Sequence, residues 1–128
     1  IKTINKMKLN QNLKADIEKY KNYVIIVEGN KDIDSLKSLG FEKVYAIHQN
    51  AVSIKERAEQ IIQQTDKKDR FCIMTDFDKK GKELYFKLKT IFQELGARLD
   101  STLRGIFLKA RISHIEGAGK FIGKLYST

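Results

Sequence analysis

The sequence predicts an α/β protein, a single Rossmann-like domain with a mostly parallel sheet of about four strands flanked by helices. Short apolar or β-branched runs alternate along the chain with segments whose apolar residues recur at helical spacing. This alternation is typical of βαβ units, in which a helix returns the chain to the start of the next parallel strand. A chain of 128 residues is long enough to bury one core. We therefore expect one domain over residues 1–128.

The first predicted elements are a helix and a strand. Leu9, Leu13 and Ile17 recur at helical spacing, which predicts an amphipathic N-terminal helix at about residues 5–21. Residues 23–27 (Tyr-Val-Ile-Ile-Val) form a continuous, mainly β-branched run. Such a run is typical of a strand that is covered on both faces.

Two helices and a strand are expected next. Residues 32–39 predict a short helix that Gly40 ends, because glycine readily adopts the left-handed conformation after a last helical turn. Residues 44–47 form a second short apolar run. Ser53 is a suitable N-cap for a helix that carries apolar residues from Ile54 to Ile62.

The second half of the chain repeats the pattern. Residues 71–75 (Phe-Cys-Ile-Met-Thr) predict a third strand, and a long amphipathic helix follows until Gly96. A weak fourth strand is expected within residues 97–103. The apolar residues near the C-terminus predict one more helix. These boundaries give a core over about residues 23–104 and a C-terminal extension over about 105–128.

The charge of the chain favours a polyanionic partner. Lysine and arginine number 25 against 16 aspartates and glutamates, which gives a net charge of +9. A basic surplus of this size suits nucleic acid, because each neutralised phosphate releases condensed counterions. The single cysteine, Cys72, cannot form an internal disulfide or a multi-cysteine zinc site. No apolar run is long enough to span a bilayer, so we expect a soluble, cytoplasmic protein without a membrane partner.

Acidic residues follow two of the predicted strands. Glu28 comes directly after the first strand, and Asp76 and Asp78 come directly after the third. Ligands of open parallel sheets bind beyond the carboxyl ends of the strands. If the two strands are neighbours, the three carboxylates meet there and require a cation, for which Mg²⁺ is suited by its preference for hard oxygen ligands. The alternative is that these residues are ordinary turn and cap residues.

Two motifs in this order resemble those of the Toprim domain. The first is Val24-Ile-Ile-Val-Glu28-Gly29-x-x-Asp32, and the second is Ile73-Met-Thr-Asp76-x-Asp78-x-x-Gly81. Toprim is the Mg²⁺-binding α/β module of bacterial-type primases, topoisomerases, OLD-family nucleases, recombination-repair proteins and the ribonuclease that matures 5S ribosomal RNA. In size and in its second motif the chain is most similar to the small stand-alone Toprim proteins of archaea, which are described as primase-like or ribonuclease-like.

The resemblance implies a site residue by residue. The family's catalytic or metal-binding glutamate falls on Glu28, and its metal-binding aspartates fall on Asp76 and Asp78. The implied cofactor is Mg²⁺, with Mn²⁺ as a substitute. Such a metal lets a phosphodiester be cut or made while a nearby carboxylate moves a proton. Glu28 is expected either to move that proton or to bind a second metal.

The chain departs from the larger members of the family. Topoisomerases carry further acidic residues after the second aspartate, where this chain has Lys79, Lys80 and Lys82. The chain is also too short for a strand-passage domain, and its one cysteine cannot build a primase zinc module. A self-sufficient topoisomerase or replicative primase is not expected.

Other residues near the motifs receive supporting roles. We expect Asp32 to cap its helix or to support the metal, and Gly29 and Gly81 to permit a sharp turn or a close approach of the backbone. His48, His114 and Cys72 are interpreted as structural. Five basic side chains are candidates for phosphate contact: Lys31, Lys79, Lys80, Lys82 and Arg104.

Two other folds place an Asp-x-Asp pair or acidic residues at strand ends. Haloacid-dehalogenase-type phosphatases have a threonine two residues after the second aspartate, where this chain has Lys80, and their motif lies near the start of the fold. Receiver domains need a phosphorylatable aspartate and a later lysine. Both are weaker interpretations than Toprim.

The sequence thus predicts Mg²⁺-dependent phosphodiester chemistry, by a nuclease or phosphodiester-transfer enzyme, with a nuclease on structured RNA or DNA preferred. The alternative is a non-catalytic nucleic-acid-binding subunit of a larger RNA- or DNA-processing complex. The natural substrate, the choice between RNA and DNA, the number of metals and the oligomeric state stay open.

Overall fold

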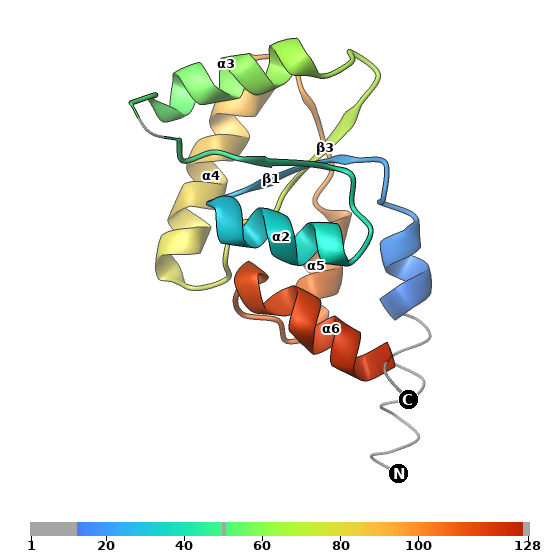
Figure 1. The fold of residues 1–128 in the computed structure, drawn as a ribbon. Helices are drawn as coiled ribbons and strands as arrows, with labels where there is room; N and C mark the ends of the chain where they lie inside the picture. The colour runs from blue at the N-terminus through green and yellow to red at the C-terminus, as the bar shows by residue number, and fades with distance from the viewer. Residues whose placement is uncertain (1–12, 50, 127–128) are drawn as a thin grey trace.

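The computed structural model describes residues 13–49 and 51–126 of the chain (Figure 1). Residues 13–18 are helical, whereas residues 5–12 of the predicted N-terminal helix lie outside the described residues. The later elements are β1 (Val24–Val27), α2 (Asn30–Ser38), β2 (Lys43–Ala46), α3 (Ile54–Gln64), β3 (Arg70–Ile73), α4 (Lys79–Glu94), β4 (Arg98–Leu99), α5 (Thr102–Lys109), a 3₁₀ turn (Ile115–Gly117) and α6 (Ala118–Tyr126).

The four strands form one parallel sheet in the order β2-β1-β3-β4. This confirms the predicted fold class. From β1 the chain moves outward to β2, and then returns across β1 to place β3 on its other side. The carboxyl ends of β1 and β3 therefore flank the point at which strand order reverses, which is where open α/β sheets bind their ligands.

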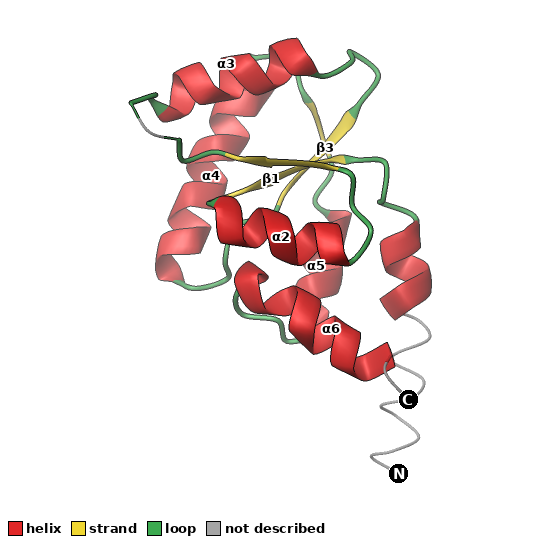
Figure 2. Ribbon diagram, viewed as in Figure 1, coloured by secondary structure: helices red, strands yellow, loops and turns green. Residues whose placement is uncertain are grey.

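Helices cover both faces of the sheet (Figure 2). Alternate residues of β1 face opposite sides. Ile25 and Val27 pack with α2, α5 and the C-terminal segment (residues 110–123), and Val24 and Ile26 pack with α3 and α4. All four side chains are fully buried. The prediction that this strand is covered on both faces is confirmed. None of the described helices combines the length and the apolar character needed to cross a membrane.

The predicted helix ends agree with the structure. Ser53 caps α3, since its side chain accepts a hydrogen bond from the Glu56 backbone amide at 3.1 Å. Gly40 and Gly96 follow α2 and α4 with φ angles of +100° and +82°. These are left-handed conformations that favour glycine after a last helical turn.

Helix α5 was not expected. The weak fourth strand is only Arg98–Leu99, and α5 begins at Thr102. The predicted boundary between core and extension, at residues 104 and 105, falls inside this helix. The helical spacing of Leu103 and Phe107, both fully buried, was the available signal, but the helix is short and Gly105 lies within it. Glycine lowers helix propensity, so the pattern was easily missed.

The C-terminal segment packs on α2. The Ser35 hydroxyl donates to the Ile115 carbonyl at 2.7 Å and accepts from the Gly119 amide at 2.8 Å. Ile115 and Ile122 are buried in the same core as α2. Residues 113 and 115 of the segment also hydrogen-bond to the loop after β3, which brings this part of the chain to the predicted site.

Candidate metal centre

Glu28 and Asp76 meet at the point where strand order reverses. The Asp76 backbone amide donates a hydrogen bond to Glu28 Oε1 at 3.2 Å. Glu28 directly follows β1, and Asp76 lies in the loop between β3 and α4. Because β1 and β3 are paired neighbours, two residues that are far apart in the sequence come together as the sequence analysis expected.

Asp76 is held from the C-terminal segment as well. Its Oδ1 accepts a hydrogen bond from the Ile115 backbone amide at 2.8 Å. The next residue, Phe77, donates its backbone amide to the Ser113 carbonyl at 3.0 Å. These bonds orient the Asp76 carboxylate, and they involve a segment that comes after the predicted core.

Asp78 is the N-cap of α4. Its Oδ1 accepts a hydrogen bond from the Gly81 amide at 2.8 Å. Its Oδ2 lies 3.7 Å from His114 Nε2. The side chain is half exposed. Oδ2 can therefore bind a metal, as predicted, while Oδ1 caps the helix.

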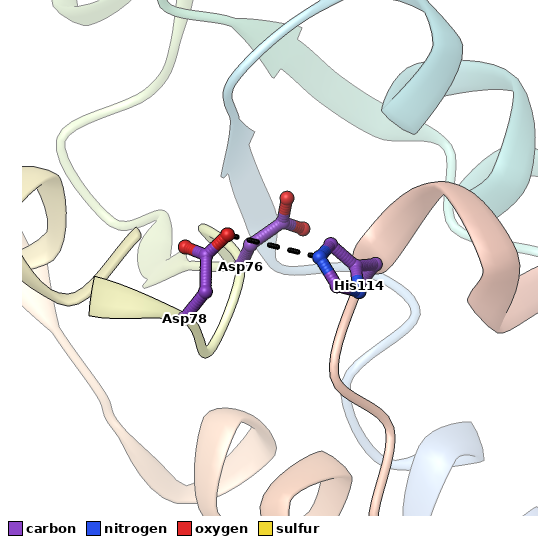
Figure 3. A group of neighbouring side chains, drawn as sticks. All are labelled: Asp76, Asp78 and His114. Carbon is purple, nitrogen blue, oxygen red and sulfur yellow. Dashed lines mark ion pairs between the residues drawn. The ribbon is translucent and has the colours of Figure 1, made fainter. Parts of the chain in front are cut away.

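His114 completes a group of three with Asp76 and Asp78 (Figure 3). One ligand atom from each of these residues lies within 4.8 Å of the other two. Glu28 is outside this group and contacts the loop through the Asp76 amide. From the sequence His114 is predicted to be structural, because a single histidine is more often a hydrogen-bonded structural residue than a ligand. Only the packing of the C-terminal segment brings it here.

The carboxylates of this site repel one another. Burial raises the pKa of the Glu28 carboxyl, and the nearby charges of Asp76, Asp32 and Asp78 add to that increase against the opposing hydrogen bond from Asp76. Burial and the Asp76 charge likewise raise the pKa of Asp32. Carboxylates held close together and partly desolvated favour a bound cation. The donor set of Asp76 and Asp78, with Glu28 beside it, is thus suited to a hard divalent ion.

Asp32 and Gly29 support the start of α2. Asp32 Oδ2 accepts a hydrogen bond from the Gly29 amide at 3.1 Å. Asp32 thus caps the first turn, which is the first of its two predicted roles. Gly29 has an extended backbone, and a Cβ added there would meet nothing within 4 Å. The structure therefore gives no steric reason for a glycine at position 29.

Arg104 secures the loop that carries the aspartates. Its guanidinium donates to the Thr75 carbonyl at 2.7 Å and to the Asp76 carbonyl at 3.2 Å. It also lies 4.4 Å from the ring centroids of both Phe77 and Tyr85, and burial lowers its pKa. These contacts give Arg104 a positioning role for the loop, where the sequence analysis predicted a phosphate clamp.

The predicted lysines lie in the first turns of α2 and α4, the two helices that begin shortly after Glu28 and Asp78. Lys79, Lys80 and Lys82 are exposed in the first turn of α4, which holds no acidic residue. Lys31 is exposed in α2, with its Nζ 4.0 Å from Glu116 Oε1. Positive charge at a helix N-terminus opposes the helix dipole. These three lysines therefore do not stabilise α4 through its dipole.

Cys72 and His48 are not part of this group. Cys72 is fully buried in β3, and burial raises the pKa of its thiol to about 12. A thiol with so high a pKa is a poor nucleophile. His48 is exposed, and its backbone amide donates to the Glu28 carbonyl at 3.0 Å.

The comparison with protein families decides the identity of the fold. Residues 23–109 match the family model described as the Toprim domain, which covers both acidic motifs and helix α5. This chain belongs to the Toprim family. The resemblance seen in its motifs is thereby confirmed, and with it a metal-dependent function related to nucleic acid.

Two archaeal relatives are similar to this Toprim protein. A UPF0292 protein of Methanosarcina barkeri is 30% identical over 107 residues, covering 80% of this chain and 71% of the relative. A UPF0292 protein of Methanocaldococcus jannaschii is 28% identical over 103 residues, covering 78% of each chain. Both agree with the predicted similarity to small archaeal Toprim proteins.

A solved structure shares the fold. It is a putative protein from Aquifex aeolicus, with a TM-score of 0.66 and 22% identity. The match covers 83% of this chain and 94% of that one. At this identity the likeness shows a shared fold and says nothing of the reaction.

Gly81 is the glycine that the Toprim site requires on steric grounds. A Cβ added there would lie 2.0 Å from the Asp76 carbonyl oxygen. The Thr75 hydroxyl also donates a hydrogen bond to the Gly81 carbonyl at 2.6 Å, which joins the same loop to α4.

Gly81→Ala is expected to lower the free energy of unfolding by about 3 kcal/mol or more, because the backbone must move. Gly105→Ala in α5 is the matched control and is expected to be neutral or stabilising, since its Cβ would meet nothing within 4 Å. Urea unfolding of both variants checks this, and equal stability would contradict the close packing of α4 on the loop.

The raised pKa of Glu28 predicts a pH-dependent effect on stability. A carboxyl whose pKa is higher in the folded than in the unfolded state destabilises the fold when ionised. This cost begins as the pH rises past the ordinary value of 4.5 and is complete above the folded pKa. In EDTA, Glu28→Gln is therefore expected to unfold at a higher temperature than wild type at about pH 8, and at the same temperature at about pH 3. An advantage that is independent of pH would contradict the electrostatic origin.

Proposed function

We propose that this Toprim protein catalyses Mg²⁺-dependent hydrolysis of phosphodiester bonds in nucleic acid. The observation that carries the proposal is the meeting of Glu28 and Asp76 at the switch point of the sheet, at a hydrogen-bond distance of 3.2 Å. The family match supports a metal-dependent function related to nucleic acid. Hydrolysis is our choice within that class.

Asp76 and Asp78 would hold the metal, and Mn²⁺ would substitute for Mg²⁺. His114 is a further candidate ligand, because it completes the group of three. A divalent ion bound there supplies charge stabilisation to the oxygens of the reacting phosphate. The hydrogen bonds from Ile115 to Asp76 and from Gly81 to Asp78 would keep both carboxylates oriented before the ion binds.

Glu28 would carry a proton during hydrolysis. Its raised pKa brings it nearer to neutral pH, where a carboxylate is a better general base. Its hydrogen bond with the Asp76 amide would fix its distance from the metal-binding loop. A ligand role toward a second metal is the alternative for this residue.

The lysines would bind phosphates on either side of the reacting bond. Lys79, Lys80 and Lys82 project from the first turn of α4, directly after Asp78, and Lys31 lies in the first turn of α2. All are exposed. Their positive charge would offset the repulsion between the acidic group and the nucleic-acid backbone.

Cleavage of a pooled panel of RNA and DNA substrates tests the proposal. Single strands, duplexes and structured RNAs would be incubated with the protein in Mg²⁺, in Mn²⁺ and in EDTA. Products that require a divalent ion and that disappear in Asp78→Asn would support it. Tight, salt-sensitive binding without products would instead favour a non-catalytic subunit of a processing complex, the second candidate, which the net charge of +9 supports.

A further inference from the structure

A mainly apolar groove of about 320 Å³ opens beside the candidate metal centre, between α4 and α5. Phe77, Tyr85, Phe86 and Leu108 line it. Phe77 lies between Asp76 and Asp78 in the sequence, so the groove and the acidic group are built on the same loop. This volume is at the small end of the range for ligand pockets, which runs from about 300 to 1,000 Å³.

The groove is edged by the most exposed large apolar side chains among the described residues. Phe86 is 63% exposed and Leu108 is 57% exposed. Phe86 makes an edge-to-face contact with Tyr85, at a centroid distance of 5.3 Å. Exposed aromatic and aliphatic side chains gathered at a groove indicate a binding surface more than a packing requirement.

Cationic groups also line this groove. Arg104 lies 4.4 Å from the rings of Phe77 and Tyr85, and Lys82 extends from the first turn of α4. An exposed aromatic ring with a lysine beside it is a combination by which proteins hold single-stranded nucleic acid, because the ring stacks on a base and the cation contacts a phosphate. Arg104 already donates to the Thr75 and Asp76 carbonyls, so Phe86 and Lys82 are the groups offered to a ligand here. A second copy of this chain, with the same cations, would bring like charges together.

We propose that the groove binds one unpaired base adjacent to the phosphate held at the metal centre. The proposal rests on the proposed function and narrows its substrate class to nucleic acid with a single-stranded or looped-out nucleotide. Phe86 would stack on the base, and Lys82 would contact the flanking phosphate. A base within a continuous duplex is already stacked and could not enter the groove.

Fluorescence anisotropy of labelled oligonucleotides tests this in the full chain. The probes are a single strand, the same strand with abasic sites, and a blunt duplex, all at one salt concentration. Wild type would be compared with Phe86→Ala and with Phe121→Ala, the latter being a 41% exposed phenylalanine on α6, away from the groove. Circular dichroism would check that both variants fold.

Phe86→Ala is expected to weaken binding of the single strand about tenfold and to leave binding of the abasic strand and the duplex unchanged. Phe121→Ala should bind like wild type. Equal affinity of all three proteins for the single strand would overturn the base site. So would a wild-type dimer that Phe86→Ala dissociates, because the groove would then be covered by a second copy.

The two proposals can fail separately. If wild type cleaves the single strand in Mg²⁺ and Phe86→Ala both binds and cleaves it equally well, the base site is overturned while the proposed function stands. If no protein cleaves but Phe86→Ala still loses affinity for the single strand alone, hydrolysis is overturned while the base site stands. If wild type binds none of the probes, the base site is overturned, and the cleavage panel, which includes structured RNA, decides hydrolysis separately.

Discussion

Glu28→Gln is expected to reduce metal-dependent turnover by at least about a hundredfold while leaving nucleic-acid affinity within about twofold of wild type. Glutamine keeps the length of the side chain and an oxygen that can accept the Asp76 amide, which donates to Glu28 Oε1 at 3.2 Å. The loop should therefore stay in place. What is lost is the negative charge and the ability to carry a proton.

Single-turnover cleavage and anisotropy with the same substrate check this expectation. Glu94→Gln is a suitable control, because Glu94 is an exposed glutamate at the far end of α4. The control should cleave at the wild-type rate. Cleavage by Glu28→Gln at that rate would remove Glu28 from the catalytic mechanism.

Asp76→Asn is expected to raise the Mg²⁺ concentration needed for half-maximal cleavage by about a hundredfold. Asparagine can still accept the Ile115 amide, which donates to Asp76 Oδ1 at 2.8 Å. The loss should therefore come from the missing charge and not from a displaced loop. A Mg²⁺ titration of the cleavage rate measures it.

The control for this variant is Asp34→Asn, which alters an exposed aspartate of α2. It should leave the Mg²⁺ dependence unchanged. If Asp76→Asn lowered the rate at saturating Mg²⁺ without changing the Mg²⁺ requirement, Asp76 would act on the substrate and not on the metal.

Most of the fold could be predicted from the sequence, because the strands and helices of each βαβ unit are encoded by local residue patterns. Continuous β-branched residues predicted β1, and Gly40 and Gly96 marked helix ends that the structure confirms. The meeting of Glu28 with Asp76 could also be predicted, since it needs only that β1 and β3 be neighbours in a parallel sheet. Helix α5 was missed because it is short and contains Gly105.

Contacts between distant segments could not be predicted in the same way. His114 reaches Asp78 only because the C-terminal segment packs on α2 through Ser35. The sequence predicts Arg104 as a phosphate clamp at the crevice, whereas its contacts with the Thr75 and Asp76 carbonyls depend on the orientation of α5. Such contacts follow from tertiary packing, which a spacing pattern along one segment does not contain.

Direct measurement of Mn²⁺ binding to the free protein tests the central claim most directly, because it requires no substrate. Electron paramagnetic resonance would follow free Mn²⁺ during titration of wild type, Asp76→Asn and Asp34→Asn. We predict saturable binding to wild type and Asp34→Asn, competition by Mg²⁺, and an affinity about a hundredfold lower for Asp76→Asn. Wild-type affinity in Asp76→Asn, or no saturable binding to wild type, would contradict a metal centre at this end of the sheet.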